Sequence, residues 1–345
     1  MSSLCSSDES ESEDDLRKIG FSKEGKLARP QIQLGLFTTL EGYPLSYEVY
    51  EGNKYEGHTL IDILAKFQKR FQLKNKPIVV ADRGMLTNAN LAFLENNSYK
   101  YILAYKIKNI SNKLKEEITS IPFIDDGQIH TIEYNKEIIY DDENGIKQSI
   151  NVQHRLILTY STKRAKKDKR TREKALQKLD KKLSANITKK DLKLSHYAKY
   201  LDIDEKCTIG YKLNPDKVKQ DEKLDGIKGY VTNDFILTPN EVIQHYQNQY
   251  EVERAFRISK TDLRIRPIYH RLETRIKAHI LVSFVSYAIY KEFERKLKIH
   301  SVKFEFSQKL LRDIIKHMMA IMINGELMYL KFDKIQQSVL DAIYD

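Results

Sequence analysis

Asp82 and Glu253 are the two residues whose types and settings best suit metal-dependent chemistry. Asp82 ends an apolar run over 77–82. Such a run is typical of a strand buried on both faces, and ligands in open α/β sheets bind beyond the carboxyl ends of such strands. Glu253 lies in a predicted helix beside a cluster of basic residues. Carboxylates from a strand end and a helix can jointly hold Mg²⁺, and two such ions about 3.5–4 Å apart can activate a water molecule against a phosphodiester. The spacing alone leaves an alternative, in which Asp82 forms a turn and Glu253 an ion pair.

Positive charge is concentrated in two regions of this chain of 345 residues, whose net charge is +11. Residues 161–193 contain fourteen Lys and Arg against four Asp and Glu, and residues 254–277 contain eight against two. Two local excesses of this size favour a polyanionic partner. For 161–193 taken alone, a solvated helix face is the alternative.

The remaining composition argues against several other classes of protein. The cysteines, Cys5 and Cys207, are far apart and not near histidine pairs, which argues against a disulfide scaffold or a structural zinc site and fits a reducing compartment. The first sixteen residues carry six acids and no Lys or Arg, unlike a targeting segment. No glycine-rich phosphate loop or nucleophile motif supports nucleotide binding or acyl transfer.

The most apolar stretch, 276–290, is too short and too interrupted by polar residues to span a membrane. We interpret it as part of a long buried helix over about 270–298. His279 lies inside this stretch and is expected to be a hydrogen-bonded core histidine.

The elements that must position the two acids follow from hydrophobic periodicity. Residues 31–106 predict the order β-β-α-β-α-β, an α/β sheet with a hairpin at one side. The predicted strands and helices lie at 31–37, 45–50, 60–71, 77–82, 87–97 and 100–106. Residues 107–237 predict a β-rich insertion with a basic helical arm at 161–193. Its predicted strands lie at 129–140, 153–160, 211–213 and 229–232.

A helix is predicted to begin at Pro239, because Thr238 and Glu241 form a capping box around a proline at the first helical position. Tyr246, Glu253 and Lys260 fall seven residues apart, which places all three on one helix face. Three apolar residues are expected to pack inward on another face: Val252, Phe256 and Leu263. The segment 307–345 is predicted to be mostly helical.

Several sequence strings resemble DDE transposases of the insertion-sequence-four superfamily. Val79–Met85 (VVADRGM), followed by Tyr99–Ile102 (YKYI), is similar to the second-aspartate region of these enzymes. The pattern Tyr246-x2-Gln249-x3-Glu253-x6-Lys260 resembles the superfamily signature Tyr-x2-Arg-x3-Glu-x6-Lys. Four further segments of this sequence resemble segments found in one branch of the superfamily. The resemblance covers about residues 13–300. The matching segments are 15–26, 225–226 before 231–233, 266–270 and 275–279.

The resemblance implies a ribonuclease-H-like mixed sheet flanked by helices. The catalytic core would comprise 16–106 and 238–300, interrupted by the insertion at 107–237. An acidic, disordered start at 1–15 and a helical segment at 301–345 would complete the chain.

The resemblance also implies three metal-binding acids, of which Asp82 matches the second and Glu253 the third. The metal would be Mg²⁺, for which Mn²⁺ can substitute. Tyr246 and Lys260 match positions that contact DNA near the cleaved end. Gln249 replaces the signature arginine and cannot make its charged contact to phosphate. Three neighbouring arginines are expected to contact DNA as well: Arg254, Arg257 and Arg266.

The first acid of the family has no clear match in the sequence. It lies on the first, central strand in a pattern like Asp-x-Thr-Thr-Leu. Only Ser2–Leu4 resembles the end of that pattern, which would put the aspartate just before Met1. No strand is predicted before Asp15, and Asp8 and Asp14 lie in no strand-like run. We therefore expect a truncated copy that lacks the first acid and the first central strand, leaves an open sheet edge and cleaves no element ends by itself.

The predicted function is that of an insertion-sequence transposase, acting on double-stranded DNA as a homodimer in the cytoplasm, in association with the nucleoid. Metal-dependent cleavage would free a 3′ hydroxyl that attacks target DNA without a covalent protein intermediate. One alternative is a catalytically inactive remnant that binds DNA or dimerises. Restoring the first strand would discriminate between the two. Another alternative is a host nuclease of the same fold, which the absence of terminal inverted repeats would favour.

Overall fold

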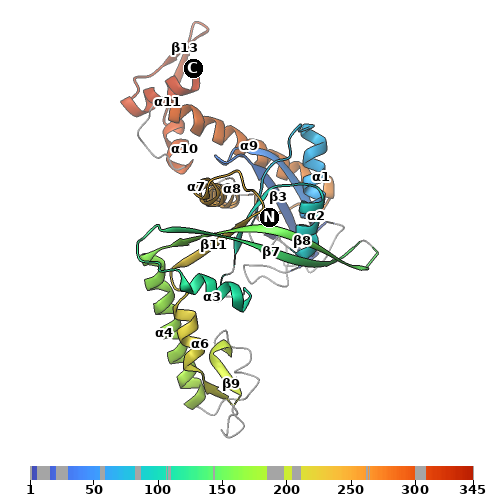
Figure 1. Ribbon diagram of the computed structural model, residues 1–345. Helices are drawn as coiled ribbons and strands as arrows, with labels where there is room; N and C mark the ends of the chain where they lie inside the picture. Colours follow the sequence, from blue (N-terminus) through green and yellow to red (C-terminus); the bar gives the residue numbers. More distant parts are fainter. Residues whose placement is uncertain are drawn as a thin grey trace. The chain divides into compact units, whose positions relative to one another are not determined.

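The computed structural model describes residues 2–5, 16–20, 30–54, 59–81, 87–105, 107, 110–142, 144–184, 198–203, 211–261, 263, 265–299 and 308–344. The chain forms two compact units, whose elements are labelled in Figure 1. Unit 1 comprises Met1–Lys76, Gly84–Phe93 and Gln247–Asp345, and unit 2 comprises Pro77–Arg83 and Leu94–Tyr246. The predicted boundaries after residues 106 and 237 both fall inside unit 2.

The sheet of unit 1 is built around strand β3. Its strands are β1 (Ser2–Cys5), β2 (Lys18–Ile19), β3 (Pro30–Thr38) and β4 (Pro44–Glu51). Strand β3 pairs antiparallel with each of the other three. The predicted hairpin of two strands near 31–37 and 45–50 is confirmed by the β3–β4 pair.

Strand β1 contradicts the expectation that no strand precedes Asp15. Its backbone pairs with β3 in a register that sets Ser2 opposite Leu34 and Cys5 opposite Gln31. The sequence pattern missed it because four residues are too few for periodicity. An open edge of β3 offers unpaired backbone groups that a short strand can satisfy without an apolar face of its own. The rest of the acidic start lies outside the described residues, and so do Asp8, Asp14 and Asp15.

Three helices pack on this sheet or on one another in unit 1: α1 (Leu60–Phe71), α8 (Gln249–Thr261) and α9 (Glu273–Ile299). Helix α1, predicted at 60–71, is held by stacking of Phe67 on Phe37 and by a 2.8 Å hydrogen bond from the Tyr50 hydroxyl to Asp62. The core between β3, α8 and α9 is a buried apolar cluster. Its members include Ile32, Leu34, Phe256, Ile265, Ile268, Ile276 and Ile280.

Helix α9 confirms the long helix predicted over about 270–298, but only one face of it is buried. Ile276, Ile280 and Tyr287 are buried, whereas Val282 and Ile289 are 65% and 66% exposed. The apolar stretch of α9 has apolar residues on every side, so the sequence does not indicate which face is buried and which stays exposed. Within the described part of the chain, no helix has the length and apolarity required to cross a membrane.

The C-terminal part of unit 1 is only partly helical. Helices α10 (Gln308–Lys316) and α11 (Lys334–Tyr344) flank a hairpin of β12 (Ala320–Ile323) and β13 (Glu326–Tyr329). Asn324 and Gly325 form its turn with φ of 51° and 86°. The prediction of a mostly helical segment is confirmed by α10 and α11 but missed this hairpin, for which an Asn-Gly pair between apolar runs is a strong signal.

Unit 2 is organised on a five-stranded sheet in the order β5-β6-β11-β8-β7. These strands are β5 (Val79–Ala81), β6 (Tyr101–Tyr105), β7 (Ile129–Asp141), β8 (Lys147–Tyr160) and β11 (Ile227–Thr232). Strands β5 and β6 are parallel, and the other pairs are antiparallel. Helix α2 (Asn88–Asn96) lies between β5 and β6 in the chain. The protein is therefore α/β with a mixed sheet flanked by helices. Three of the four predicted strands of 107–237 continue the sheet of β5 and β6, and the fourth, at 211–213, pairs elsewhere.

Helices of unit 2 cover the sheet and extend from it. Helix α3 (Asn112–Ser120) packs Leu114 and Ile118 on residues of β8 and β11. Helix α4 (Thr162–Ser184) runs away from the sheet with α6 (Pro215–Glu222) beside it (Figure 1). Three short elements complete this arm: η4 (Ala198–Tyr200), β9 (Leu201–Ile203) and β10 (Tyr211–Leu213). The predicted basic helical arm is confirmed over the length of α4.

Candidate metal and DNA-binding site

The strand that leads to Asp82 has the predicted character. Strand β5 is a three-residue run in which Val79 and Ala81 are buried, and it pairs parallel with β6. The carboxyl ends of parallel neighbours lie at the same edge of a sheet, where α/β proteins place their ligands. Asp82 itself lies outside the described residues, so its role stays a prediction.

A buried polar network fixes the neighbouring strand β6. The Tyr101 hydroxyl donates to Glu95 at 2.6 Å and lies 2.6 Å from Nε2 of His154. Because one hydroxyl hydrogen cannot serve both partners, we assign the second bond to a proton on Nε2 of His154. This leaves Nδ1 of His154 as a buried acceptor without a partner among the described residues. Burial, followed by the charge of Lys136, lowers the pKa of His154 to about 4, so the ring is neutral at neutral pH.

Asn233 joins β6 to the end of β11. Its Oδ1 accepts from the backbone N–H of Tyr101 at 3.0 Å, and its Nδ2 donates to Glu95 and to the Tyr99 carbonyl oxygen. Asn233 belongs to one of the strings that resemble the transposase superfamily. These hydrogen bonds show that Asn233 positions β6, a role that the resemblance of the sequence string did not indicate.

Helix α7 (Pro239–Gln247) begins with the predicted capping box. The Thr238 hydroxyl accepts from the backbone N–H of Glu241 at 3.3 Å, and the Thr238 N–H donates to the Glu241 carboxylate at 2.7 Å. The Tyr246 ring packs on Tyr230 at a centroid distance of 5.1 Å. Both rings belong to an apolar cluster that contains Val80 of β5. Tyr246 thus packs into the same cluster as the strand that immediately precedes Asp82.

The expectation of one continuous helix through Tyr246, Glu253 and Lys260 was wrong. Helix α7 ends at Gln247 and helix α8 begins at Gln249, so Tyr246 lies on a different helix from the other two. Asn248 occupies the break, and its carbonyl accepts from the N–H of Glu251 at 2.9 Å. Asparagine favours helix caps over helix interiors, which explains an interruption that heptad spacing cannot indicate.

Helix α8 presents Glu253 on its outer face. The Glu253 side chain is exposed and makes no hydrogen bond or ion pair with the described part of the chain. Arg257, one turn later, could have been its ion-pair partner, but contacts the Tyr250 hydroxyl at 3.4 Å. The alternative that Glu253 is an ordinary ion-pairing helix residue therefore has no contact in its favour. An exposed, unpaired carboxylate is free to act as an oxygen ligand of a hard cation.

The inner face of α8 packs as predicted. Phe256 and Val252 join the core formed with β3 and α9, and Leu263 packs beside a second cluster that includes Ala255 and Ile258. This packing fixes the rotation of α8 and therefore the outward direction of Glu253. Lys260 lies seven residues after Glu253 on the same helix and is half-buried.

Arg254 makes internal ion pairs on α8. Its guanidinium donates to Glu294 at 2.5 Å and to Glu251 at 3.3 Å, and the buried Lys291 ammonium lies 2.6 Å from Glu294. Burial opposes ionisation of Glu294, yet the hydrogen bonds from Arg254 and Lys291 hold its pKa below the ordinary value. These contacts join α8 to α9. The predicted DNA contact of Arg254 would compete with them, and Arg266, also half-buried, stays a predicted contact.

Asp225 and Gly226, another matched string, have a structural role. Asp225 accepts from Arg172 of α4, and the Gly226 N–H donates to Asp168 of α4 at 3.1 Å. Gly226 has φ of +81°, and a Cβ there would lie 2.8 Å from the Ser161 carbonyl oxygen. These two residues attach α4 to the start of β11, a function that the sequence string alone did not indicate.

A cavity of about 850 Å³ opens in unit 2 between the sheet and the arm. Its lining includes Tyr246 together with Tyr105, Tyr200 and Tyr230. Five basic side chains also line it: Lys115, Arg164, Lys199, Lys217 and Lys228. Two acids, Asp168 and Asp221, line it too and pair with Arg164 and Lys199, so the setting of Tyr246 is aromatic and mixed in charge. In the part of the chain that the structure describes, no group of three or more His, Cys, Asp or Glu residues forms a metal site.

Comparison with known protein families agrees with the resemblance of the sequence strings. The family model of the transposase DDE domain matches residues 6–289, which include both Asp82 and Glu253. A comparison with curated proteins found no match. Because the family match covers most of the chain, this protein belongs to the transposase DDE domain family, an enzyme family that catalyses phosphoryl transfer on DNA.

Proposed function

We propose that this protein is an insertion-sequence transposase of the insertion-sequence-four superfamily, with a ribonuclease-H-like core that cleaves DNA and transfers its strands in a metal-dependent reaction. The single observation that carries the proposal is the Glu253 carboxylate, which is exposed and unpaired among the described residues, on a helix of a transposase DDE domain. A carboxylate without an ion-pair partner, beside basic residues, is suited to binding a cation next to phosphate. As an ordinary surface residue it would have a nearby partner in Arg257.

Asp82 and Glu253 would hold Mg²⁺, and their oxygen ligands match the preference of that ion. When bound, the metal supplies activation of water and charge stabilisation at the leaving oxygen of the phosphodiester. Glu253 is held outward by the packing of Phe256 and Val252, which keeps its carboxylate accessible. Mn²⁺ would substitute because it accepts the same oxygen ligands.

The basic and aromatic residues near the acids would position DNA. Arg257 and Lys260 would contact phosphates that flank the reacting one, which fixes the register of the duplex without reading its sequence. Tyr246 would hold the end of the element. Two copies of the chain would act on the two ends of an element. The expectation of a truncated copy stays a prediction, which the DNA sequence ahead of the Met1 codon tests.

The proposal is tested by titrating the full chain with Mn²⁺ and recording the free ion by electron paramagnetic resonance, with and without duplex DNA. We expect Glu253→Gln to weaken Mn²⁺ binding at least tenfold, because it removes a charged ligand while keeping the size of the side chain. Glu292→Gln is the matched control, since Glu292 lies on helix α9 and pairs with Arg295 at 2.6 Å. Equal Mn²⁺ affinities of the Glu253→Gln variant and the unchanged chain would rule out the metal role.

A further inference from the structure

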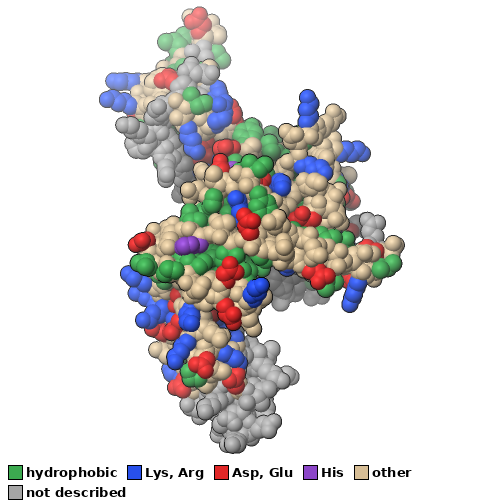
Figure 2. Space-filling model, viewed as in Figure 1, with side chains coloured by type: hydrophobic (Ala, Val, Ile, Leu, Met, Phe, Trp, Pro, Cys, Tyr) green, Lys and Arg blue, Asp and Glu red, His purple; other side chains and the backbone are tan. Residues whose placement is uncertain are grey.

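Helix α4 carries a continuous basic face on its exposed side. At 3.6 residues per turn, seven exposed cations fall within about 120° of the helix circumference. They are Lys163, Lys166, Lys167, Arg170, Lys174, Lys178 and Lys181, named here the basic face of α4. The three acids of the helix, Asp168, Glu173 and Asp180, lie outside this arc. Figure 2 shows Lys and Arg side chains gathered over this helix.

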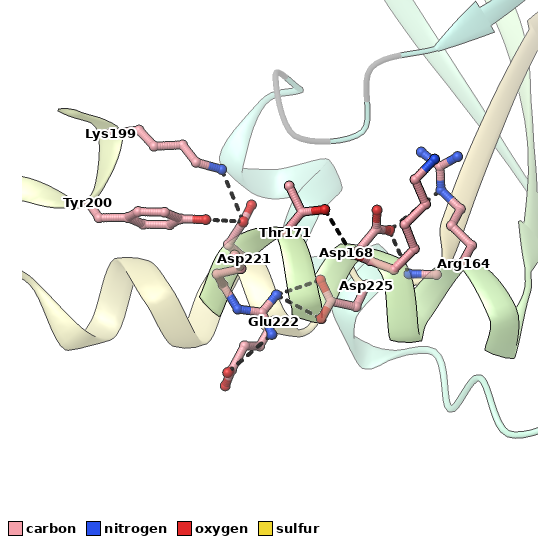
Figure 3. Close-up of polar contacts among 11 residues, drawn as sticks. Arg164, Asp168, Thr171, Lys199, Tyr200, Asp221, Glu222 and Asp225 are labelled. Atoms are coloured by element: carbon pink, nitrogen blue, oxygen red, sulfur yellow. Dashed lines mark hydrogen bonds and ion pairs between the residues drawn. The ribbon is translucent and has the colours of Figure 1, made fainter. Parts of the chain in front are cut away.

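The other side of α4 is packed and neutralised. Arg172, the buried cation of the helix, donates to Asp225 at 2.6 and 2.7 Å and to Glu222 at 3.2 Å. Figure 3 shows Asp225 and Glu222 turned toward α4. Ala175 and Leu179 are buried as well, and Leu179 packs with Tyr200. This packing fixes which side of α4 faces outward, and seven of its cations lie on that side, whereas Arg164 and Lys169 lie elsewhere on the helix.

The basic face is not an ordinary solvated helix surface. A solvated face usually mixes charges, with acids and bases paired one turn apart. None of the seven cations has a hydrogen-bonded or ion-paired side-chain partner among the described residues. Four like-charged pairs instead lie four residues apart, and each destabilises the helix. They are Lys163–Lys167, Lys166–Arg170, Arg170–Lys174 and Lys174–Lys178. A bound polyanion would remove this repulsion.

The spacing of the cations is of the same order as that of phosphates in a nucleic-acid backbone. From Lys163 to Lys181 the helix rises about 27 Å, so the seven cations follow one another about every 4.5 Å along its axis. One strand of duplex DNA carries a phosphate about every 3.4 Å along its axis. We propose that the basic face of α4 binds the phosphate backbone of double-stranded DNA without regard to its sequence. This inference rests on the proposed function, because it assigns a second surface to the same substrate.

The composition of α4 selects duplex DNA over other polyanions. The helix contains no aromatic residue, so it offers no platform on which unpaired bases could stack. Its basic face contains no apolar residue that could enter a lipid surface. Long cationic side chains suit contact with phosphates, which positions a duplex but does not specify bases.

The test is the salt dependence of binding to a 30-base-pair duplex of arbitrary sequence, measured by fluorescence anisotropy with the full chain. The variant combines Lys167→Gln, Arg170→Gln, Lys174→Gln and Lys178→Gln. Each lost phosphate contact should reduce the slope of log affinity against log salt by about 0.9, so the full variant should lose about 3–4 units of slope. Glutamine is a good helix former, so α4 should persist, which circular dichroism checks.

The matched control removes the same charge from exposed lysines elsewhere: Lys113→Gln, Lys147→Gln, Lys316→Gln and Lys331→Gln. We expect it to change the slope by less than one unit. A charge-retaining variant, Lys167→Arg with Lys174→Arg and Lys178→Arg, should keep the original slope. Equal decreases of the salt slope in the basic-face and control variants, or no decrease in the basic-face variant, would overturn the proposal. Tighter binding of duplex RNA or anionic vesicles through these residues would overturn it too.

The outcome separates this inference from the proposed function. The glutamine variant of α4 should bind Mn²⁺ as the unchanged chain does. If the glutamine variant of α4 keeps the salt slope of the unchanged chain while Mn²⁺ still binds at Glu253, only the role of α4 is refuted. If Mn²⁺ does not bind at Glu253 while the glutamine variant of α4 shows the expected lower salt slope, only the metal-dependent reaction is refuted.

Discussion

At the scale of the residue, the informative groups are those whose hydrogen-bonding or charge requirements are left unmet. Glu253 is a carboxylate without a partner in the described part of the chain, whereas neighbouring acids and bases on α8 and α9 are paired. His154 is a buried imidazole with one satisfied and one unsatisfied nitrogen. The first is the residue that we propose as a metal ligand. The second points to a structural group that must remain neutral.

We expect the stability of unit 2 to depend on the protonation of His154. Its pKa is about 4 in the folded chain and 6.5 when exposed. Unfolding therefore takes up a proton between these values, and stability should fall as the pH is lowered from 6.5 toward 4. The pKa difference corresponds to about 3 kcal/mol. Urea unfolding followed by circular dichroism at several pH values measures it.

The control for this prediction is a second histidine. His154→Gln should flatten the pH dependence in that window, and His317→Gln, at an exposed position, should leave it unchanged. If the free energy of unfolding of the His154→Gln variant depends on pH as strongly as before, another group titrates in this window.

At the scale of the element, the attachment of α4 depends on the turn before β11. We expect Gly226→Ala to destabilise unit 2, because a Cβ would lie 2.7 Å from the Tyr160 ring and 2.8 Å from the Ser161 carbonyl oxygen. Gly127→Ala is the control, since Gly127 also has a positive φ, of +84°, but has open space around it. The two share backbone strain, so the collision alone should make Gly226→Ala more destabilising by about 1–3 kcal/mol. Chemical denaturation compares them, and equal losses would contradict the packing of this turn.

Most strands and helices were predictable because they carry long, regular patterns. The strands of β3, β4, β7 and β8 and the start of α7 follow apolar runs, alternation and a capping box. Strand β1 could not be predicted, because its four residues gain their stability from the edge of β3. The break at Asn248 also escaped, because a cap competes with a helical pattern that continues on both sides.

The candidate site was predictable to a different extent. The sequence strings identified Glu253 and Tyr246, and the structure adds that one is unpaired while the other packs with β5. The pairing of Arg254 with Glu294 was not predictable, because the two residues lie forty positions apart. The bracing of α4 by Asp225 also needed the folded chain, since it joins residues from separate elements.

At the scale of the whole molecule, the excess of positive charge separates into regions with different surroundings. On α8 the cations lie beside an unpaired acid, as expected where phosphate and metal are bound together. On α4 they form a face without acids, as expected where a duplex is held by its backbone. We therefore expect a chain with a net charge of +11 to bind DNA broadly, while the proposed chemistry depends on Asp82 and Glu253.

The central claim is that Asp82 and Glu253 bind the same metal site, and iron-directed cleavage of the protein tests it most directly. Fe²⁺ replaces Mg²⁺, and with ascorbate and peroxide it generates radicals that cut the backbone near the ion. Mass spectrometry of the fragments should show cuts near residues 82 and 253, both suppressed by excess Mg²⁺. Either Asp82→Asn or Glu253→Gln should abolish both sets of cuts. Cuts at only one of the two positions, or cuts that Mg²⁺ does not suppress, would contradict a shared metal site.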